Sequence, residues 1–112
     1  MMIQESGRVI ENQRVRGAYR VLLLELPKIA GEAQPGQFVH VKVPGLEASR
    51  LRRPFSIAGA EHGVLRLLYK DVGAGSHALS LVGAGTVVDV LGPVGRGFPI
   101  ECEGTPLLVG GG

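Results

Sequence analysis

The stretch Phe55–Lys70, FSIAGAEHGVLRLLYK, predicts the fold more directly than any other part of the chain. Two apolar runs, Phe55–Gly59 and Val64–Lys70, flank the segment Glu61-His62-Gly63. Every second residue of the later run is a large side chain, Leu, Leu and Tyr, which is the period of a strand with one buried face. A short polar segment that ends in glycine favours a tight turn between two such runs. We therefore expect an antiparallel β-hairpin here.

Outward from this hairpin, the chain repeats the same arrangement of short apolar runs bounded by glycine or proline. The further candidate strands are Arg8–Val15, Tyr19–Leu26, Phe38–Val43 and Thr86–Leu91. Pro35-Gly36 turns the chain into the third of the six strands, where valines alternate with His40 and Lys42. The chain has 18 glycines and 7 prolines, many of which interrupt these runs. This spacing is typical of a compact β domain.

Only one helix is expected. Ser76 is placed to cap it, His77–Val82 forms its body, and Gly83 suits the residue that ends it. Such a short helix needs packing to stabilise it, because its propensity alone is insufficient. The predicted fold class is therefore all-β: a six-stranded antiparallel Greek-key barrel with one short capping helix, closed so that no sheet edge is exposed.

Composition sets limits on the function. The 112 residues fit one domain, and a formal net charge of +2 is too small to indicate nucleic acid on its own. The single cysteine, Cys102, forms no internal disulfide and no four-cysteine metal site, which favours a reducing compartment. The run Val21–Leu26 is too short to span a bilayer, and no signal peptide is evident. We expect a cytoplasmic protein that binds neither membrane nor nucleic acid.

The last residues differ from the rest of the chain. The run Thr105–Val109 enters Gly110-Gly111-Gly112, and a strand that runs into glycines is how a nucleotide-binding βαβ unit begins. We expect residues 1–104 to form the barrel and residues 105–112 to be the first strand and glycine turn of a truncated NAD-binding domain. The alternative is a flexible glycine tail.

Two segments carry the candidate chemistry. In an extended strand, Arg53 and Phe55 share one face, and Pro54 and Ser56 share the other. A cation, a ring and a hydroxyl in this arrangement suit a flat aromatic cofactor with a diphosphate tail. Downstream, the glycine-rich turn Val72–Ser76 leads into the predicted helix, whose free N–H groups attract phosphate. The alternative for that turn is a plain strand–turn–helix with a capping serine.

Taken together and in order, these segments resemble the FAD-binding domain of the ferredoxin–NADP reductase superfamily. Within it the chain is most similar to the electron-transfer subunit of the NAD-dependent (class 1B) dihydroorotate dehydrogenase. The segments that carry the resemblance are Pro35–Val39, Arg53–Ile57, Leu68–Lys70, Gly73–Ser76, Leu91–Phe98 and Leu107–Gly112.

The resemblance implies roles for these residues. Arg53 pairs with the FAD diphosphate, with Pro54 in the same cofactor-binding strand, and Phe55 lies along the flavin. Ser56 is the candidate catalytic residue, because its hydroxyl bonds near flavin N5, the atom that accepts hydride. Leu68, Tyr69 and Lys70 line the ribityl and adenosine side, partly through backbone groups. Gly75 and Ser76 provide the bonds from the helix start to the diphosphate.

The resemblance also implies a function. In the complete subunit NADH reduces FAD, and electrons pass through a 2Fe-2S centre to an FMN-containing dihydroorotate dehydrogenase catalytic subunit, within a heterotetramer of pyrimidine biosynthesis. The chain lacks the cysteine cluster for 2Fe-2S and the NAD(H)-binding domain beyond its first strand, so the fragment would hold FAD at most and would be inactive alone. The alternatives are the related flavin subunits of sulfide dehydrogenase or transhydrogenase type, and an OB-like nucleic-acid-binding module. The latter is disfavoured by 4% aromatic residues and no tryptophan.

Overall fold

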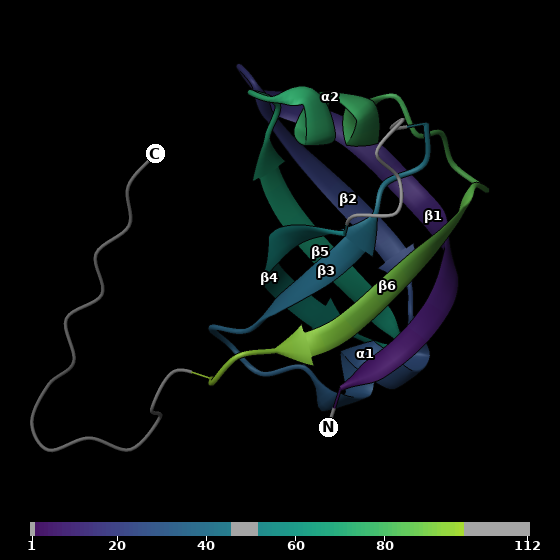
Figure 1. Cartoon of the computed structure of the whole chain (residues 1–112), viewed down its shortest axis with the longest axis vertical. Helices are drawn as coiled ribbons and strands as arrows, with labels where there is room; N and C mark the ends of the chain where they lie inside the picture. Colours follow the sequence, from purple (N-terminus) through teal and green to yellow (C-terminus); the bar gives the residue numbers. More distant parts are fainter. Residues whose placement is uncertain (1, 46–51, 98–112) are drawn as a thin grey trace, which may run out of the picture.

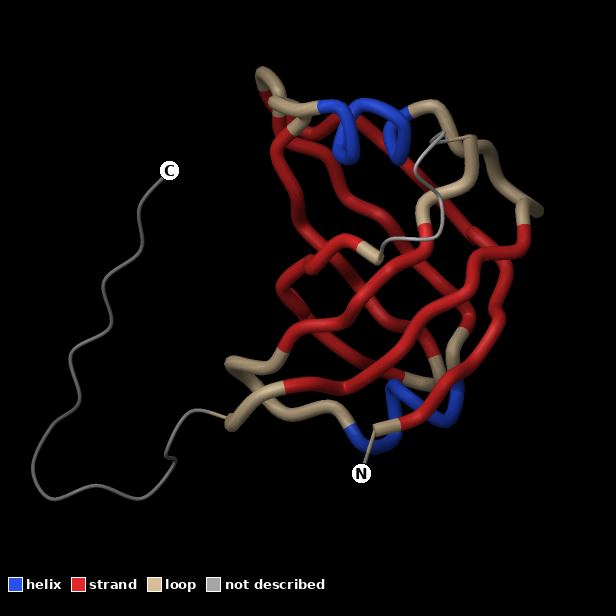
Figure 2. Tube along the Cα trace, viewed as in Figure 1, coloured by secondary structure: helices blue, strands red, loops and turns tan. Residues whose placement is uncertain are grey.

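The structure is a computed structural model that describes residues 2–45 and 52–97. Its strands form a closed antiparallel barrel in the order β1-β2-β5-β4-β3-β6, which confirms the predicted six-stranded Greek-key barrel (Figures 1 and 2). The strands are β1 (Ile3–Arg16), β2 (Tyr19–Glu25), β3 (Phe38–Lys42), β4 (Arg53–Glu61), β5 (Val64–Lys70) and β6 (Val87–Val94). The strand Thr105–Val109, the glycine turn and Cys102 lie outside the described residues.

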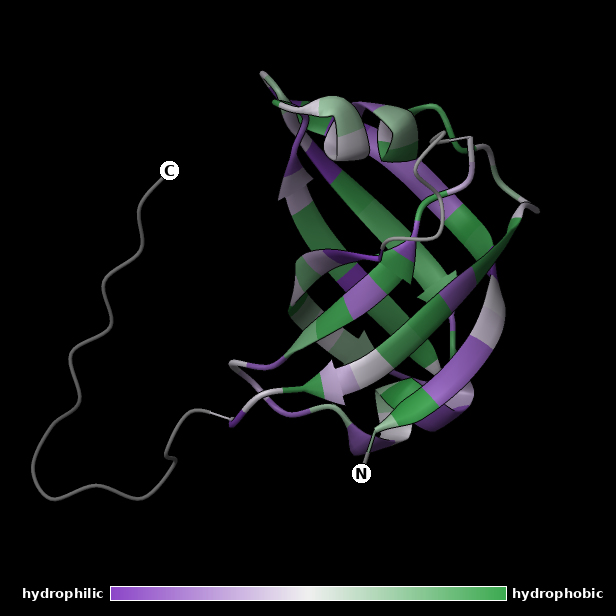
Figure 3. Cartoon of the chain, viewed as in Figure 1, coloured by the Kyte–Doolittle hydropathy of each residue, from purple (hydrophilic) through white to green (hydrophobic). Residues whose placement is uncertain are grey.

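The barrel interior is filled by the residues that alternate along each strand. Val39 and Val41 of β3, and Leu65 and Leu67 of β5, have no exposed surface. Figure 3 shows the resulting alternation of hydrophobic and hydrophilic bands along the strands. Each buried aliphatic side chain stabilises the fold by roughly 1.5–3 kcal/mol relative to an exposed one, so this pattern fixes which face of every strand points inward.

The predicted hairpin joins β4 to β5. Glu61 pairs with Val64, so the loop consists of His62 and Gly63 alone. Both have positive φ values, 52° for His62 and 78° for Gly63. This is the turn whose twist matches that of two antiparallel strands. The β4–β5 ladder runs from this turn to the pair Ile57 and Leu67, and the first residues of β4, Arg53–Ser56, pair with β3 instead.

Several strand boundaries were predicted too narrowly. β1 begins before Arg8, β4 extends beyond Phe55–Gly59 at both ends, and β6 continues past Leu91. β6 can continue because Gly92 carries no side chain: a β-carbon there would lie 2.8 Å from Cγ1 of Val39 on β3. Such close approach of neighbouring strands is a reason for glycine within a sheet.

The predicted short capping helix is present, and the structure has a second helix that was not predicted. Helix α1 (Pro27–Glu32) lies at one end of the barrel and α2 (Ala74–Ser80) at the other (Figure 1). The Glu5 carboxylate on β1 accepts hydrogen bonds from the backbone N–H groups of Lys28 (3.1 Å) and Ile29 (2.9 Å) at the start of α1. The cap of α1 comes from a distant strand, and the local signal of its start is Pro27 in its first turn. None of the described helices is long and apolar enough to cross a membrane.

The position of α2 also differs from the prediction of His77–Val82 with a Ser76 cap. The helix begins at Ala74, its N-cap is Gly73, and Ser76 is its third residue. The Ser76 hydroxyl accepts hydrogen bonds from the backbone N–H groups of Val72 and Gly73, both at 3.0 Å. The serine therefore does close the helix start, but by folding back onto the residues before it.

Candidate functional site

Strand β4 presents its side chains as the sequence predicts. Arg53 and Phe55 are half-buried and face inward, whereas Pro54 and Ser56 are exposed on the outer face. Phe55 packs against the core cluster. Inward-facing residues at this end of the barrel are held by packing, so the direction of the Arg53 side chain is set by the strand that carries it.

The decisive feature of the site is the contact between Arg53 and Gly75. A β-carbon placed on Gly75 would lie 3.2 Å from both Cγ and Nε of Arg53, and 3.4 Å from Cδ. The arginine side chain thus runs directly across the first turn of α2, in the space that any other residue at position 75 would occupy. The two segments singled out in the sequence therefore converge, one by a guanidinium and the other by backbone.

The charge of Arg53 is not neutralised within the described part of the chain. Its neighbour Arg52 pairs with Asp89, with 3.0 Å between Nη2 and Oδ1. By contrast, no carboxylate in residues 2–45 or 52–97 forms an ion pair with Arg53. A half-buried guanidinium beside backbone amides and without a counter-charge is suited to an anion. Arg50 lies outside the described residues.

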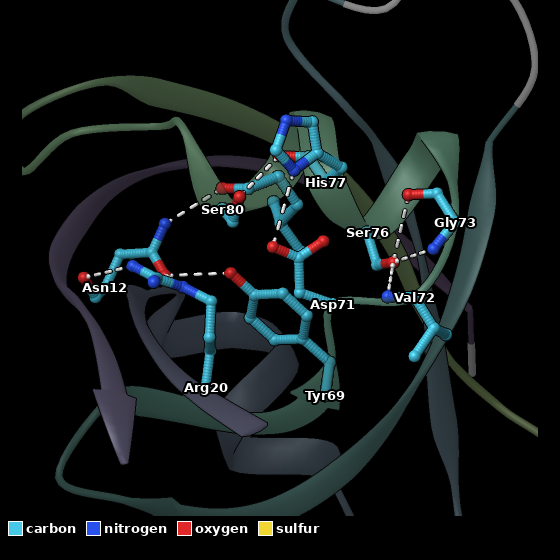
Figure 4. A network of polar contacts seen from close by, with 10 residues as sticks. Asn12, Arg20, Tyr69, Asp71, Val72, Gly73, Ser76, His77 and Ser80 are labelled. Carbon is cyan, nitrogen blue, oxygen red and sulfur yellow. Dashed lines mark hydrogen bonds and ion pairs between the residues drawn. The ribbon is translucent and has the colours of Figure 1, made fainter. Parts of the chain in front are cut away.

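The start of α2 contributes backbone groups to the same place. The Ser76 hydroxyl accepts from the N–H group of Gly73, whereas the N–H groups of Ala74 and Gly75 donate to no side chain among the described residues and remain available. The helix has only seven residues, so its dipole is a small contribution, and Arg53 supplies most of the positive charge. Figure 4 shows Ser76 and the backbone N–H groups of Val72 and Gly73 that donate hydrogen bonds to its hydroxyl.

The remaining predicted residues lie on β5, and their side chains point to opposite faces of the strand. Tyr69 is only 5% exposed and points into the barrel, where its ring meets that of Phe55 edge-on at 5.7 Å between centroids. Leu68 and Lys70 are on the outer face. The Lys70 ammonium lies 5.5 Å from the centre of the Tyr19 ring. The structure therefore associates Lys70 with β2, and the cation that faces α2 is Arg53.

Comparison with known proteins identifies the family of the chain. Residues 6–98, which include both β4 and α2, match the family described as oxidoreductase FAD-binding domain. The chain belongs to this family. FAD is therefore its cofactor, as the sequence resemblance implied.

The FAD-binding domain has relatives among characterised proteins. It is 40% identical to the electron transfer subunits of dihydroorotate dehydrogenase B (NAD(+)) of Bacillus cereus (strain AH187) and Bacillus anthracis (strain A0248), over 99% of this chain and 45% of each relative. The chain thus spans about half the length of these relatives. Among solved structures, it matches an NADH-dependent reduced ferredoxin–NADP oxidoreductase (28% identity, TM-score 0.76) over 85% of this chain and 34% of that one. A cytochrome P450 reductase of Amycolatopsis matches with 27% identity and a TM-score of 0.74, over 94% of this chain and 33% of that one.

The FAD-binding domain also contains a polar network that sequence reasoning missed. The buried hydroxyl of Tyr69 donates a 2.9 Å hydrogen bond to Oδ1 of Asn12 on β1, and Arg20 of β2 donates to the same oxygen at 3.4 Å (Figure 4). Burial raises the pKa of the Tyr69 hydroxyl above its usual 10.0, and the neighbouring Arg20 offsets only part of this effect. An isolated asparagine and arginine within strand-like segments gave no signal of this network in the sequence.

Proposed function

We propose that this chain is the FAD-binding part of an electron-transfer subunit of the NAD-dependent dihydroorotate dehydrogenase type. The observation that supports this most strongly is the Arg53 side chain lying across Gly75, 3.2 Å from the position of a β-carbon, with no carboxylate partner in the described residues. The 40% identity to subunits of that name supports the choice within the family.

In this proposal Arg53 and α2 hold the FAD diphosphate from two sides. The planar guanidinium donates charge-assisted hydrogen bonds to phosphate oxygens, and the backbone N–H groups at Gly75 and Ser76 donate from the helix. Glycine suits position 75 because a β-carbon there would press against Arg53. The Ser76 hydroxyl is already bonded to backbone at Val72 and Gly73, so its contribution is to hold the helix start in place.

The rest of β4 and β5 would hold the flavin itself. Phe55 provides ring surface, and Pro54 stiffens the strand between the two contact residues. Ser56 lies three residues beyond Arg53, roughly 10 Å along the strand, which is comparable to the ribityl chain and inner ring that separate the diphosphate from flavin N5. Its exposed hydroxyl would donate a hydrogen bond near N5. Leu68 and Lys70, with the backbone of Tyr69, would line the ribityl and adenosine side.

FAD supplies the redox chemistry when bound, because it takes up a hydride and passes electrons on singly. We infer that in the complete protein the electrons move between NAD(H) and a partner FMN-containing dihydroorotate dehydrogenase through a 2Fe-2S centre, in a cytoplasmic heterotetramer that forms orotate. In this proposal residues 105–112 begin the NAD(H)-binding domain, and the chain alone is inactive. A flavin subunit of transhydrogenase type is a second candidate, favoured by the 28% identity to a ferredoxin–NADP oxidoreductase.

Substitution of the two adjacent arginines tests the diphosphate site. Arg53→Ala should weaken FAD binding by roughly 1.5–3 kcal/mol, the scale of a hydrogen bond to a charged group. Arg52→Ala is the matched control, because it removes the same side chain from a position already paired with Asp89. FAD affinity would be measured by fluorescence titration of the protein with its complete natural sequence. Equal affinities of the two variants would exclude the proposed role of Arg53.

A further inference from the structure

The side chain of Asn12 joins three separate segments of the barrel. Its Nδ2 donates hydrogen bonds to the backbone carbonyls of Leu79 and Val82, both at 2.9 Å, at the C-terminal end of α2. Its Oδ1 accepts from the Tyr69 hydroxyl and from Nε of Arg20. An asparagine amide has two donor hydrogens and one acceptor oxygen with two lone pairs, so every one of them is used here.

Helix α2 depends on such contacts for its position. Its seven residues are too few to be stable in isolation, and the last carbonyls of any helix lack partners within it. Asn12 provides a partner for Leu79, whose side chain is also fully buried in the core. Gly75 lies four residues before Leu79, on the same face of the helix. Fixing α2 at Leu79 therefore also fixes where Gly75 meets Arg53.

Tyr69 connects the same network to strand β4. Its hydroxyl bonds to Asn12, and its ring contacts that of Phe55, two residues after Arg53. We propose that Asn12 and the Tyr69 hydroxyl are positioning residues that hold α2 against β4 at the spacing the FAD diphosphate requires. This inference rests on the proposed function, because it concerns the same diphosphate site, on which Asn12 and the Tyr69 hydroxyl act through α2 and Phe55.

Two variants test the proposal in the protein with its complete natural sequence. Tyr69→Phe removes only the hydroxyl and keeps the ring against Phe55. Asn12→Asp keeps the shape but replaces the donor amide by an oxygen that faces two carbonyls. The control is Gln13→Glu, which makes the same change of amide to carboxylate on the exposed neighbouring residue. The measurements are the Kd for FAD, and the phosphorus NMR and visible absorption spectra at saturating FAD.

We expect both variants to weaken FAD binding roughly 3- to 30-fold, the range for residues that act through a packed network. The phosphorus resonances of bound FAD should shift while the visible flavin band is unchanged, because the diphosphate surroundings move and those of the ring do not. Gln13→Glu should leave all three measurements as they are.

Other results would overturn the inference. Unchanged phosphorus resonances in Tyr69→Phe would show that the network only contributes to overall stability, even if the melting temperature falls. If Asn12→Asp does not fold, Tyr69→Phe decides the question by itself. Failure of the unsubstituted protein to bind FAD would reject the proposed function, whereas normal binding by the unsubstituted protein and by both variants would reject only the positioning role.

Discussion

Replacement of Gly75 by alanine should lower FAD affinity without lowering folding stability. The added β-carbon would lie 3.2 Å from Cγ and Nε of Arg53. Ordinary contacts of such atoms are 3.4–4 Å, so Arg53 must move by a few tenths of an ångström. Gly75 lies within α2, where alanine is favoured over glycine by up to about 1 kcal/mol. Folding stability should therefore stay the same or rise, while the guanidinium is displaced from its place across the helix.

The expected loss of FAD affinity follows from that displacement. A hydrogen bond to a charged group contributes roughly 1.5–3 kcal/mol, and a displaced guanidinium weakens it without removing it. We therefore expect a loss of about 1 kcal/mol, which is roughly a fivefold increase in Kd. Flavin fluorescence titration gives the Kd, and thermal melting without FAD gives the change in stability.

Gly83→Ala is the matched control, because a β-carbon at Gly83 meets nothing within 4 Å. It makes the same chemical change beyond the other end of α2 and should leave the FAD affinity as it is. An FAD affinity of Gly75→Ala equal to that of this control would refute the reasoning. It would mean that the space between Arg53 and α2 is not where the diphosphate binds.

Three further predictions concern individual side chains. Ser56→Ala should slow reduction of the bound flavin in stopped-flow measurements more than it lowers FAD affinity; a normal rate would remove the role near N5. Ser76→Ala should lower the free energy of unfolding by about 1 kcal/mol, which is typical of a lost helix-cap hydrogen bond. Amide hydrogen exchange should accelerate at Val72 and Gly73, and unchanged exchange there would contradict this prediction. The pKa of Tyr69 is raised in the folded protein, so its contribution to stability is complete below the ordinary value of 10.0 and is lost as pH rises above it. Urea unfolding should show this decrease, and Tyr69→Phe should abolish it.

The barrel was predictable because its signals are local. The hairpin turn at His62-Gly63 and the alternation along β3 and β5 each depend on residues close in sequence. Helix α1 was missed because its cap, Glu5, comes from a distant strand, and its one local start signal, Pro27, also suits a turn. The start of α2 was predicted at His77 and lies at Ala74. The sequence does not distinguish the two, because a serine serves equally well as the N-cap or as the third helical residue that folds back.

The candidate site was partly predictable for the same reason. Arg53 and Gly75 were identified from motifs, and the structure brings them into contact at the first turn of α2. Asn12 was missed because its importance arises only from partners on β2, β5 and α2. In the sequence alone, a polar residue in a strand cannot be told from an ordinary surface residue, because its hydrogen-bond partners come from distant segments.

The hairpin that joins β4 to β5 connects the two halves of the site. One arm, β4, carries Arg53, and the other, β5, leads into α2, which carries Gly75. The lengths of the two arms therefore help to set where Arg53 meets the start of α2. The ladder already accommodates an unmatched residue through the irregularity between Ile57 and Gly59. An insertion in one arm alone would move Arg53 relative to the start of α2 by about 3.3 Å per residue, so we expect it to separate Arg53 from Gly75.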